Sequence, residues 1–152
     1  MNDPKKISLA IIYFMLSTAI TWWFVDSSPL YESLQQKLLS TGIAGAKWCL
    51  QIAAAYFFLG NKRWEFIKHI AATCLVGSVI LLPSAILASF NDFNSATFFV
   101  ISLLTAVVVM ISLYYWAVKR SALAYKWFWG WIICLGIAIT LQLTVVFSVI
   151  KF

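Results

Sequence analysis

Lys47 and Gln51 are the residues of greatest chemical interest, because both lie in one apolar stretch, Gly42–Leu59. That stretch is long enough to cross the hydrocarbon of a membrane, where a charged side chain is costly and marks a candidate site. Gln51 lies four positions after Lys47, so both side chains share one face of a helix. We expect the pair to bind an anionic or polar group that enters from the outer side of the membrane.

Two acidic residues are candidate partners for Lys47. Asp26 and Asp92 each directly follow an apolar stretch and are expected on the same side of the membrane as Lys47. The lysine is expected about one helical turn inside the outer edge, within reach of either carboxylate. The alternative is structural: Lys47 extends its ammonium to the interface, and Gln51 hydrogen-bonds to a neighbouring helix.

A second polar feature is a stripe of small residues near the end of the chain. Its members recur at every fourth position and are Gly136, Thr140, Thr144 and Ser148. Such stripes are usually packing seams between membrane helices. The alternative is that Thr140 and Thr144 line a pathway for a small polar solute.

Patterns typical of catalysis, metals and cofactors are missing from the sequence. The three cysteines form no C-x-x-C pair and are expected to pack as small apolar residues; they are Cys49, Cys74 and Cys134. His69 is the single histidine, has no cluster of zinc ligands around it, and is expected at the membrane interface. We therefore expect no enzyme, no metal and no cofactor.

The composition indicates an integral membrane protein. The chain has 152 residues, of which 63% are hydrophobic and 11% charged, with a mean hydropathy of +0.92. The apolar residues form runs of about 20, the length that crosses a bilayer as a helix. They do not alternate with polar residues as in a β-barrel. The expected fold is an all-α helical bundle, a single transmembrane domain over residues 1–152.

Five transmembrane helices are expected, at approximately 7–25, 43–59, 70–90, 96–118 and 127–150. Lys5 and Lys6 could begin a signal peptide, but the first run is too long and lacks a small-residue cleavage site. Pro83 should kink the third span. The segments Gly60–His69 and Lys119–Lys126 are expected as basic loops.

The polar connection Asp26–Thr41 is expected to form a short interfacial helix between the first and second spans. Ser28 could cap it, three leucines recur every fourth residue, and Gly42 could end it. Such a helix would lie on the outer surface with its apolar face down. The alternative is an ordinary structured loop. The small residues that follow permit close contact between helices; they are Gly42, Ala44, Gly45 and Ala46.

Charge sets the expected orientation. Eight basic residues fall on one side of the predicted spans: Lys5, Lys6, Lys62, Arg63, Lys68, Lys119, Arg120 and Lys126. Three fall on the other: Lys37, Lys47 and Lys151. Because basic residues in short loops stay in the cytoplasm, the N-terminus is expected inside and the C-terminus outside. The pattern suits a bacterial inner membrane, and the same clustering in short loops argues against nucleic-acid binding.

A weak internal repeat relates the second and third spans to the fourth and fifth. In both halves a basic loop precedes a span that carries Cys-Leu near a glycine, at Cys74-Leu75 and at Cys134-Leu135. If the repeat is real, the two pairs of spans are parallel repeats, as in some transporters.

Three classes of function remain open. The first is a non-catalytic accessory, assembly or scaffold subunit, with the lipid bilayer, other membrane subunits or further copies of itself as partners. The second is a small transporter, channel or flippase that works as a homo-oligomer, with its site at Lys47, Gln51 and the stripe of the fifth span. The third is a membrane enzyme that acts on lipid or quinone, for which acids, bases and metal ligands are missing.

Overall fold

The protein is a bundle of long helices in the computed structural model, which describes residues 4–92 and 94–147. The helices are α1 (Pro4–Ser27), α2 (Leu34–Phe58), α3 (Arg63–Val79), α4 (Leu82–Asn91), α5 (Ala96–Arg120) and α6 (Lys126–Phe147), with one 3-10 turn, η1 (Gly60–Lys62). No strand occurs in the described ranges. The expectation of an all-helical fold is confirmed.

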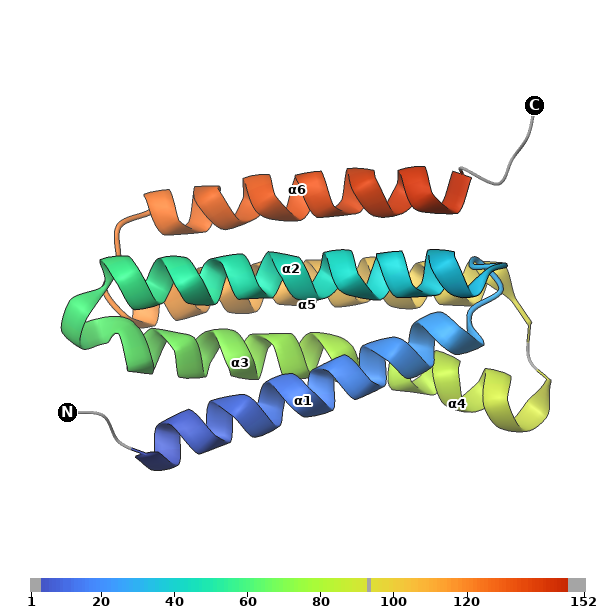
Figure 1. Cartoon of the computed structure of the whole chain (residues 1–152), viewed down its shortest axis with the longest axis horizontal. Helices are drawn as coiled ribbons and strands as arrows, with labels where there is room; N and C mark the ends of the chain where they lie inside the picture. Colours follow the sequence, from blue (N-terminus) through green and yellow to red (C-terminus); the bar gives the residue numbers. More distant parts are fainter. Residues whose placement is uncertain (1–3, 93, 148–152) are drawn as a thin grey trace.

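The long helices run up and down (Figure 1). The start of α1 lies at one end of the bundle, together with the α2–α3 and α5–α6 connections, whereas the α1–α2 and α4–α5 connections lie at the other end. Helix α3 packs against α1, α2 and α5, while α6 packs mainly against α2. Among the described residues, four helical stretches are long and apolar enough to cross a membrane: Pro4–Ser27, Gly60–Asn91, Ala96–Arg120 and Lys126–Phe147.

The prediction of a separate interfacial helix between the first two spans is wrong. Residues 34–58 form one continuous helix, and Gly42 lies inside it rather than at its end. The helix begins at Ser33, whose side chain accepts from the Gln36 N–H, while the Gln36 side chain accepts from the Ser33 N–H. This reciprocal cap replaces the one expected at Ser28, whose hydroxyl accepts from the N–H of Leu30 in a turn.

The first turns of α2 expose apolar side chains and bury polar ones against the rest of the bundle. Leu34 and Leu38 are exposed, whereas Gln36 and Ser40 are buried. The Gln36 amide donates to the Val145 carbonyl of α6 at 3.2 Å, and Gln142 of α6 donates to the Ser40 carbonyl at 3.1 Å. These bonds hold the start of α2 against the end of α6, so the polar face of α2 is satisfied inside the bundle.

Tyr31 closes the same end of the bundle, in the connection between α1 and α2. Its hydroxyl accepts a hydrogen bond from Ser40 at 2.9 Å. Burial raises the pKa of the Tyr31 hydroxyl above its ordinary value, and the bond from Ser40 opposes this in part. Tyr31 therefore stays a neutral phenol that anchors the connection to α2.

The kink expected at Pro83 is confirmed, and it divides the third span into α3 and α4. Pro83 has no N–H to donate to the preceding turn, and the helix breaks at Ile80 and Leu81 before α4 begins. The prediction of a basic loop over Gly60–His69 is wrong from Arg63 onward, because α3 already begins there. Phe66 and Ile67 are fully or nearly fully buried, so this stretch packs as a helix.

Gly60 provides the sharp turn from α2 into α3. Its φ of +49° lies in the left-handed region, which glycine adopts at little cost. The neighbouring Lys62 then places its ammonium 3.4 Å from the carbonyl oxygens of Ser121 and Ala122, just after α5 ends. A lysine at the carboxyl end of a helix offsets the partial negative charge there. This contact ties the two basic connections together.

Hydroxyl groups form the seam between α1 and α3. Ser17 of α1 lies 2.6 Å from the hydroxyl of Ser78 and 2.9 Å from the sulfur of Cys74, both in α3. Thr21 lies one turn further along α1 and 3.2 Å from the Ser78 hydroxyl. Small polar residues of this kind let two membrane helices approach closely and bond to each other.

Replacing Gly77 by alanine should weaken the packing of α3 against α5. A methyl group at Gly77 would lie 2.5 Å from Cγ and 2.6 Å from Sδ of Met110, so Met110 must move. Overpacking of this kind costs about 1–3 kcal/mol, which the free energy of unfolding in detergent would register. Gly136→Ala is the matched control, since its added methyl meets no neighbouring atom within 4 Å. Because alanine is favoured over glycine inside a helix, the two variants are compared with each other, and equal stability of Gly77→Ala and Gly136→Ala would contradict this packing.

Candidate binding site around Lys47

Lys47 lies in the middle of α2. The sequence had instead suggested a position about one turn from the outer end of its helix. Because α2 begins at Leu34 and ends at Phe58, at 1.5 Å per residue Lys47 is about 20 Å from one end and about 16 Å from the other. The four-carbon stem of lysine is much shorter than either distance. Lys47 therefore cannot carry its ammonium to either end of the helix.

The Lys47 side chain borders a shallow groove between α2 and α6. The groove has a volume of about 220 Å³ and is lined by Ile43, Ala46, Lys47, Leu50, Cys134, Ile137, Ala138 and Leu141. All of these residues except Lys47 are apolar or weakly polar. The groove is thus an apolar surface feature with one positive charge on its wall.

Two aromatic rings contact the Lys47 ammonium. The nitrogen lies 4.9 Å from the ring centroid of Trp48 and 6.0 Å from that of Trp131. Cation–π contacts of this length recover about 0.5–2 kcal/mol. They lower the cost of the charge without neutralising it.

The acidic residues expected to pair with Lys47 are occupied or placed elsewhere. Asp26 accepts from the Lys37 ammonium at 2.8 Å through its carboxylate and at 2.9 Å through its carbonyl. Asp92 is exposed and forms the left-handed cap that ends α4. Within residues 4–92 and 94–147, Lys47 has no ion pair.

Gln51 turns into the bundle and bonds to two other helices. Its carbonyl oxygen accepts from the Tyr114 hydroxyl of α5 at 2.8 Å, and its amide nitrogen donates to the sulfur of Cys134 in α6 at 3.5 Å. Gln51 therefore serves as a hydrogen-bonded link among α2, α5 and α6. Such hydrogen bonding of Gln51 to a neighbouring helix is the structural alternative considered from the sequence. Gln51 is therefore engaged in helix packing, whereas Lys47 is not bonded to it in the described chain.

Three aromatic side chains form the centre of this region. Trp131 stacks on Tyr114 with ring centroids 4.4 Å apart and planes 7° apart, and Trp48 lies against Trp131 at 5.8 Å. Trp131 is fully buried, and its indole N–H has no described hydrogen-bond acceptor. No local pattern predicts this cluster, because Trp127, Trp129 and Trp131 together resemble an interfacial aromatic belt.

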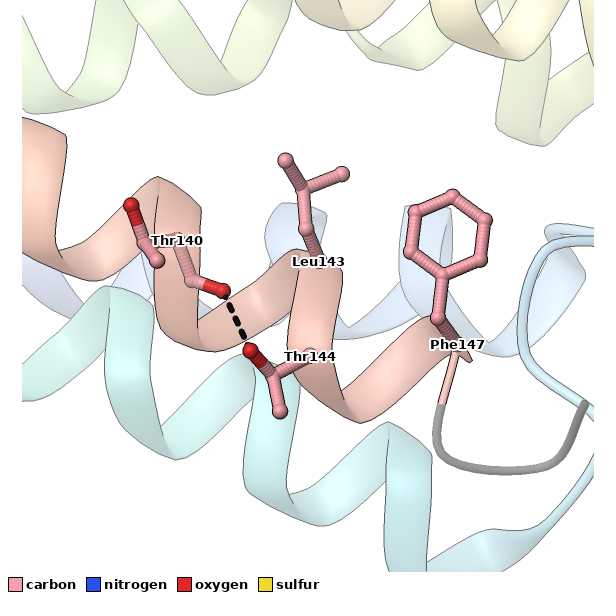
Figure 2. A pocket seen from close by; sticks show the side chains of 4 residues that line it. All are labelled: Thr140, Leu143, Thr144 and Phe147. Carbon is pink, nitrogen blue, oxygen red and sulfur yellow. Dashed lines mark hydrogen bonds between the residues drawn. The ribbon is translucent and has the colours of Figure 1, made fainter.

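Thr140 and Thr144 lie on the surface of α6 and not inside the bundle. Both are exposed, and each hydroxyl donates to the carbonyl four residues earlier at 2.9 Å. Figure 2 shows the bond from the Thr144 hydroxyl to the Thr140 carbonyl, with Leu143 and Phe147 lining the same pocket. The four residues line an open depression of about 520 Å³. Their hydroxyls are thus engaged with their own helix.

The remaining candidate residues bring no chemistry together. Nδ1 of His69 lies 2.7 Å from the carbonyl oxygen of Glu65, and the His69 ring contacts the ring of Trp116. Cys49 is exposed, Cys74 is buried, and neither these nor Cys134 forms a disulfide in the described chain. No group of three or more metal-ligating side chains occurs among the described residues.

Comparison with known protein families, with curated proteins and with solved structures finds no match to this chain. Within the described bundle, internal polar groups such as Gln51 hydrogen-bond to other helices, whereas Lys47 lies at mid-helix beside an apolar groove.

Proposed function

We propose that the protein is a non-catalytic subunit of a larger membrane complex, with an accessory, assembly or scaffold role. The observation that carries this proposal is Lys47. It lies at the middle of α2 beside a groove on the bundle surface, without an acidic partner in the described chain. Charged residues inside membranes pair with one another or line a functional path. A subunit that meets its partner at Lys47 explains why such a residue is present.

The proposal includes five membrane crossings. Helix α2 is not among the four stretches that are long and apolar enough to cross a membrane, but it lies alongside α3 and α6 within the bundle (Figure 1). If its neighbours cross the bilayer, α2 must cross with them. The end of the bundle that holds the α2–α3 and α5–α6 connections carries most of the basic residues and would face the cytoplasm. A bacterial inner membrane is the location that we propose.

The arrangement of polar groups gives less support to the alternative, a homo-oligomeric transporter, channel or flippase. Gln51 is committed to Tyr114 and Cys134, and the hydroxyls of Thr140 and Thr144 bond to their own helix. A pathway for a polar solute would need such groups to be available along it. Only Lys47 then remains of the polar site considered for transport.

Purification from native membranes tests the proposed function. The tagged chain should be extracted in mild detergent together with at least one other membrane protein in fixed stoichiometry. Unspecific carry-over is controlled by a second tagged membrane protein of similar size, expressed to the same level. Recovery of the chain alone or only as a homo-oligomer, followed by solute flux in vesicles made from it, would instead establish the transporter.

A further inference from the structure

We propose that the groove between α2 and α6 receives a transmembrane helix of another protein, and that this helix places a carboxylate against Lys47. The inference rests on the proposed function and adds the chemistry of the partner. It is built on the charge of Lys47, on the shape and composition of the groove, and on where the acidic residues of this chain lie.

Charge defines the first requirement of the partner. The described contacts of the Lys47 ammonium include the faces of Trp48 and Trp131 but no carboxylate, and Asp26, one of the two acids expected to pair with it, already binds Lys37. A positive charge in hydrocarbon is strongly favoured to pair with a negative one. The carboxylate of an aspartate or glutamate at mid-membrane would provide that pair.

The surface of α2 beside the groove suits a helix as the occupant. Gly42 and Ala46 are four residues apart, on the same face as the exposed Leu50, and a methyl group added at Gly42 or Gly45 would meet no neighbouring atom within 4 Å. Small residues at this spacing let a second helix approach the backbone closely. The sequence had suggested such contact for this turn, and the bundle itself does not use it at Gly42 or Gly45.

The described acidic residues of a second copy of this chain could not supply the carboxylate. The chain has five acidic residues, of which Asp3 lies outside the described residues; the other four lie at or near a helix end or in a connection: Asp26, Glu32, Glu65 and Asp92. In a symmetric dimer within one membrane, none of these four would lie at the depth of Lys47. The acid is therefore assigned to a different protein.

Site-specific photo-crosslinking in native membranes tests the proposal. A photoreactive residue is placed in the groove at Leu50 or Ile137, and on other exposed faces of the bundle at Met15 of α1 or Leu104 of α5. We expect the groove positions to capture one protein whose transmembrane helix carries an acid at mid-depth. Lys47→Met should reduce this product by about tenfold or more, since an unpaired charge would remain on the partner. Lys47→Arg should retain it.

Replacing the acid of the captured helix by its amide should give the same loss as Lys47→Met. Each other outcome overturns the proposal in a recognisable way. Products at Met15 or Leu104 alone would leave the proposed function intact but place the partner elsewhere. A groove product with the mass of a dimer or of a lipid adduct would replace the partner helix by a second copy or by lipid. Absence of any protein product at all four positions would remove both the inference and the proposed function.

Discussion

Replacing Lys47 by methionine is expected to make the isolated protein more stable. Insertion measurements put the cost of a lysine at the centre of a transmembrane helix at about 2.5–3.5 kcal/mol. The contacts of Lys47 with Trp48 and Trp131 recover only part of this, about 0.5–2 kcal/mol. The variant should therefore gain about 0.5–3 kcal/mol in free energy of unfolding, measured in bicelles on the purified chain.

Two variants separate charge from other effects of the Lys47 substitution. Lys47→Arg keeps the positive charge and should show no gain. Lys119→Met removes an exposed lysine from the last turn of α5 and should change stability by less than about 0.5 kcal/mol. A clear loss of stability in Lys47→Met would mean that the lysine serves the fold of the monomer, and the argument for a partner would fail.

Replacing Trp131 by alanine is expected to cause the largest loss of stability in this chain. Trp131 is fully buried and contacts both Tyr114 of α5 and Trp48 of α2. Truncating a buried tryptophan to alanine typically costs about 3–5 kcal/mol. Because these rings join α6 to α2 and α5, α6 should detach first, and the free energy of unfolding in bicelles should fall by that amount.

Trp129 is a matched control for Trp131 on the same helix. It lies two residues away and is 61% exposed, so Trp129→Ala should cost less than about 1 kcal/mol. Trp131→Phe should fall between the two, since a smaller ring keeps part of the stacking. Equal losses at Trp129 and Trp131 would show that α6 is rotated relative to the arrangement described above.

The sequence predicts the long apolar helices well because their signal is local. The fourth span was expected over 96–118 and is found as Ala96–Arg120, and the fifth was expected from 127 and begins at Lys126. The break at Pro83 follows equally from local chemistry, the missing N–H of proline. The predicted end of the fifth span, residue 150, lies outside the described residues.

The start of α2 could not be predicted in the same way. Gly42 looked like a helix end, since glycine inside a helix costs about 1 kcal/mol relative to alanine. In the structure that cost is offset by contacts between distant parts of the chain, such as Gln36 with the Val145 carbonyl. No local pattern reveals a partner so far along the sequence. Because the sequence places the start of this span at residue 43, it also predicts that Lys47 lies near the membrane surface.

The candidate site was predicted only in part for a related reason. Spacing placed Lys47 and Gln51 on one face of a helix, but it could not show that Gln51 bonds to Tyr114 and Cys134 while Lys47 borders the groove. That difference depends on how α5 and α6 are rotated against α2. The same rotation decides that Trp131 is buried while Trp129 is exposed.

Depth in the membrane along α2 tests the central claim most directly, namely that Lys47 lies in the middle of a helix that crosses the bilayer. Spin labels can be placed at Leu38, Leu50 and Phe57, which are all exposed, with Lys47 left intact. Collision rates with oxygen and with a water-soluble nickel complex then report the depth of each label. We expect Leu50 to be deepest, with Leu38 and Phe57 nearer the two surfaces. Equal shallow depths at all three positions, or a steady change from Leu38 to Phe57, would contradict the account.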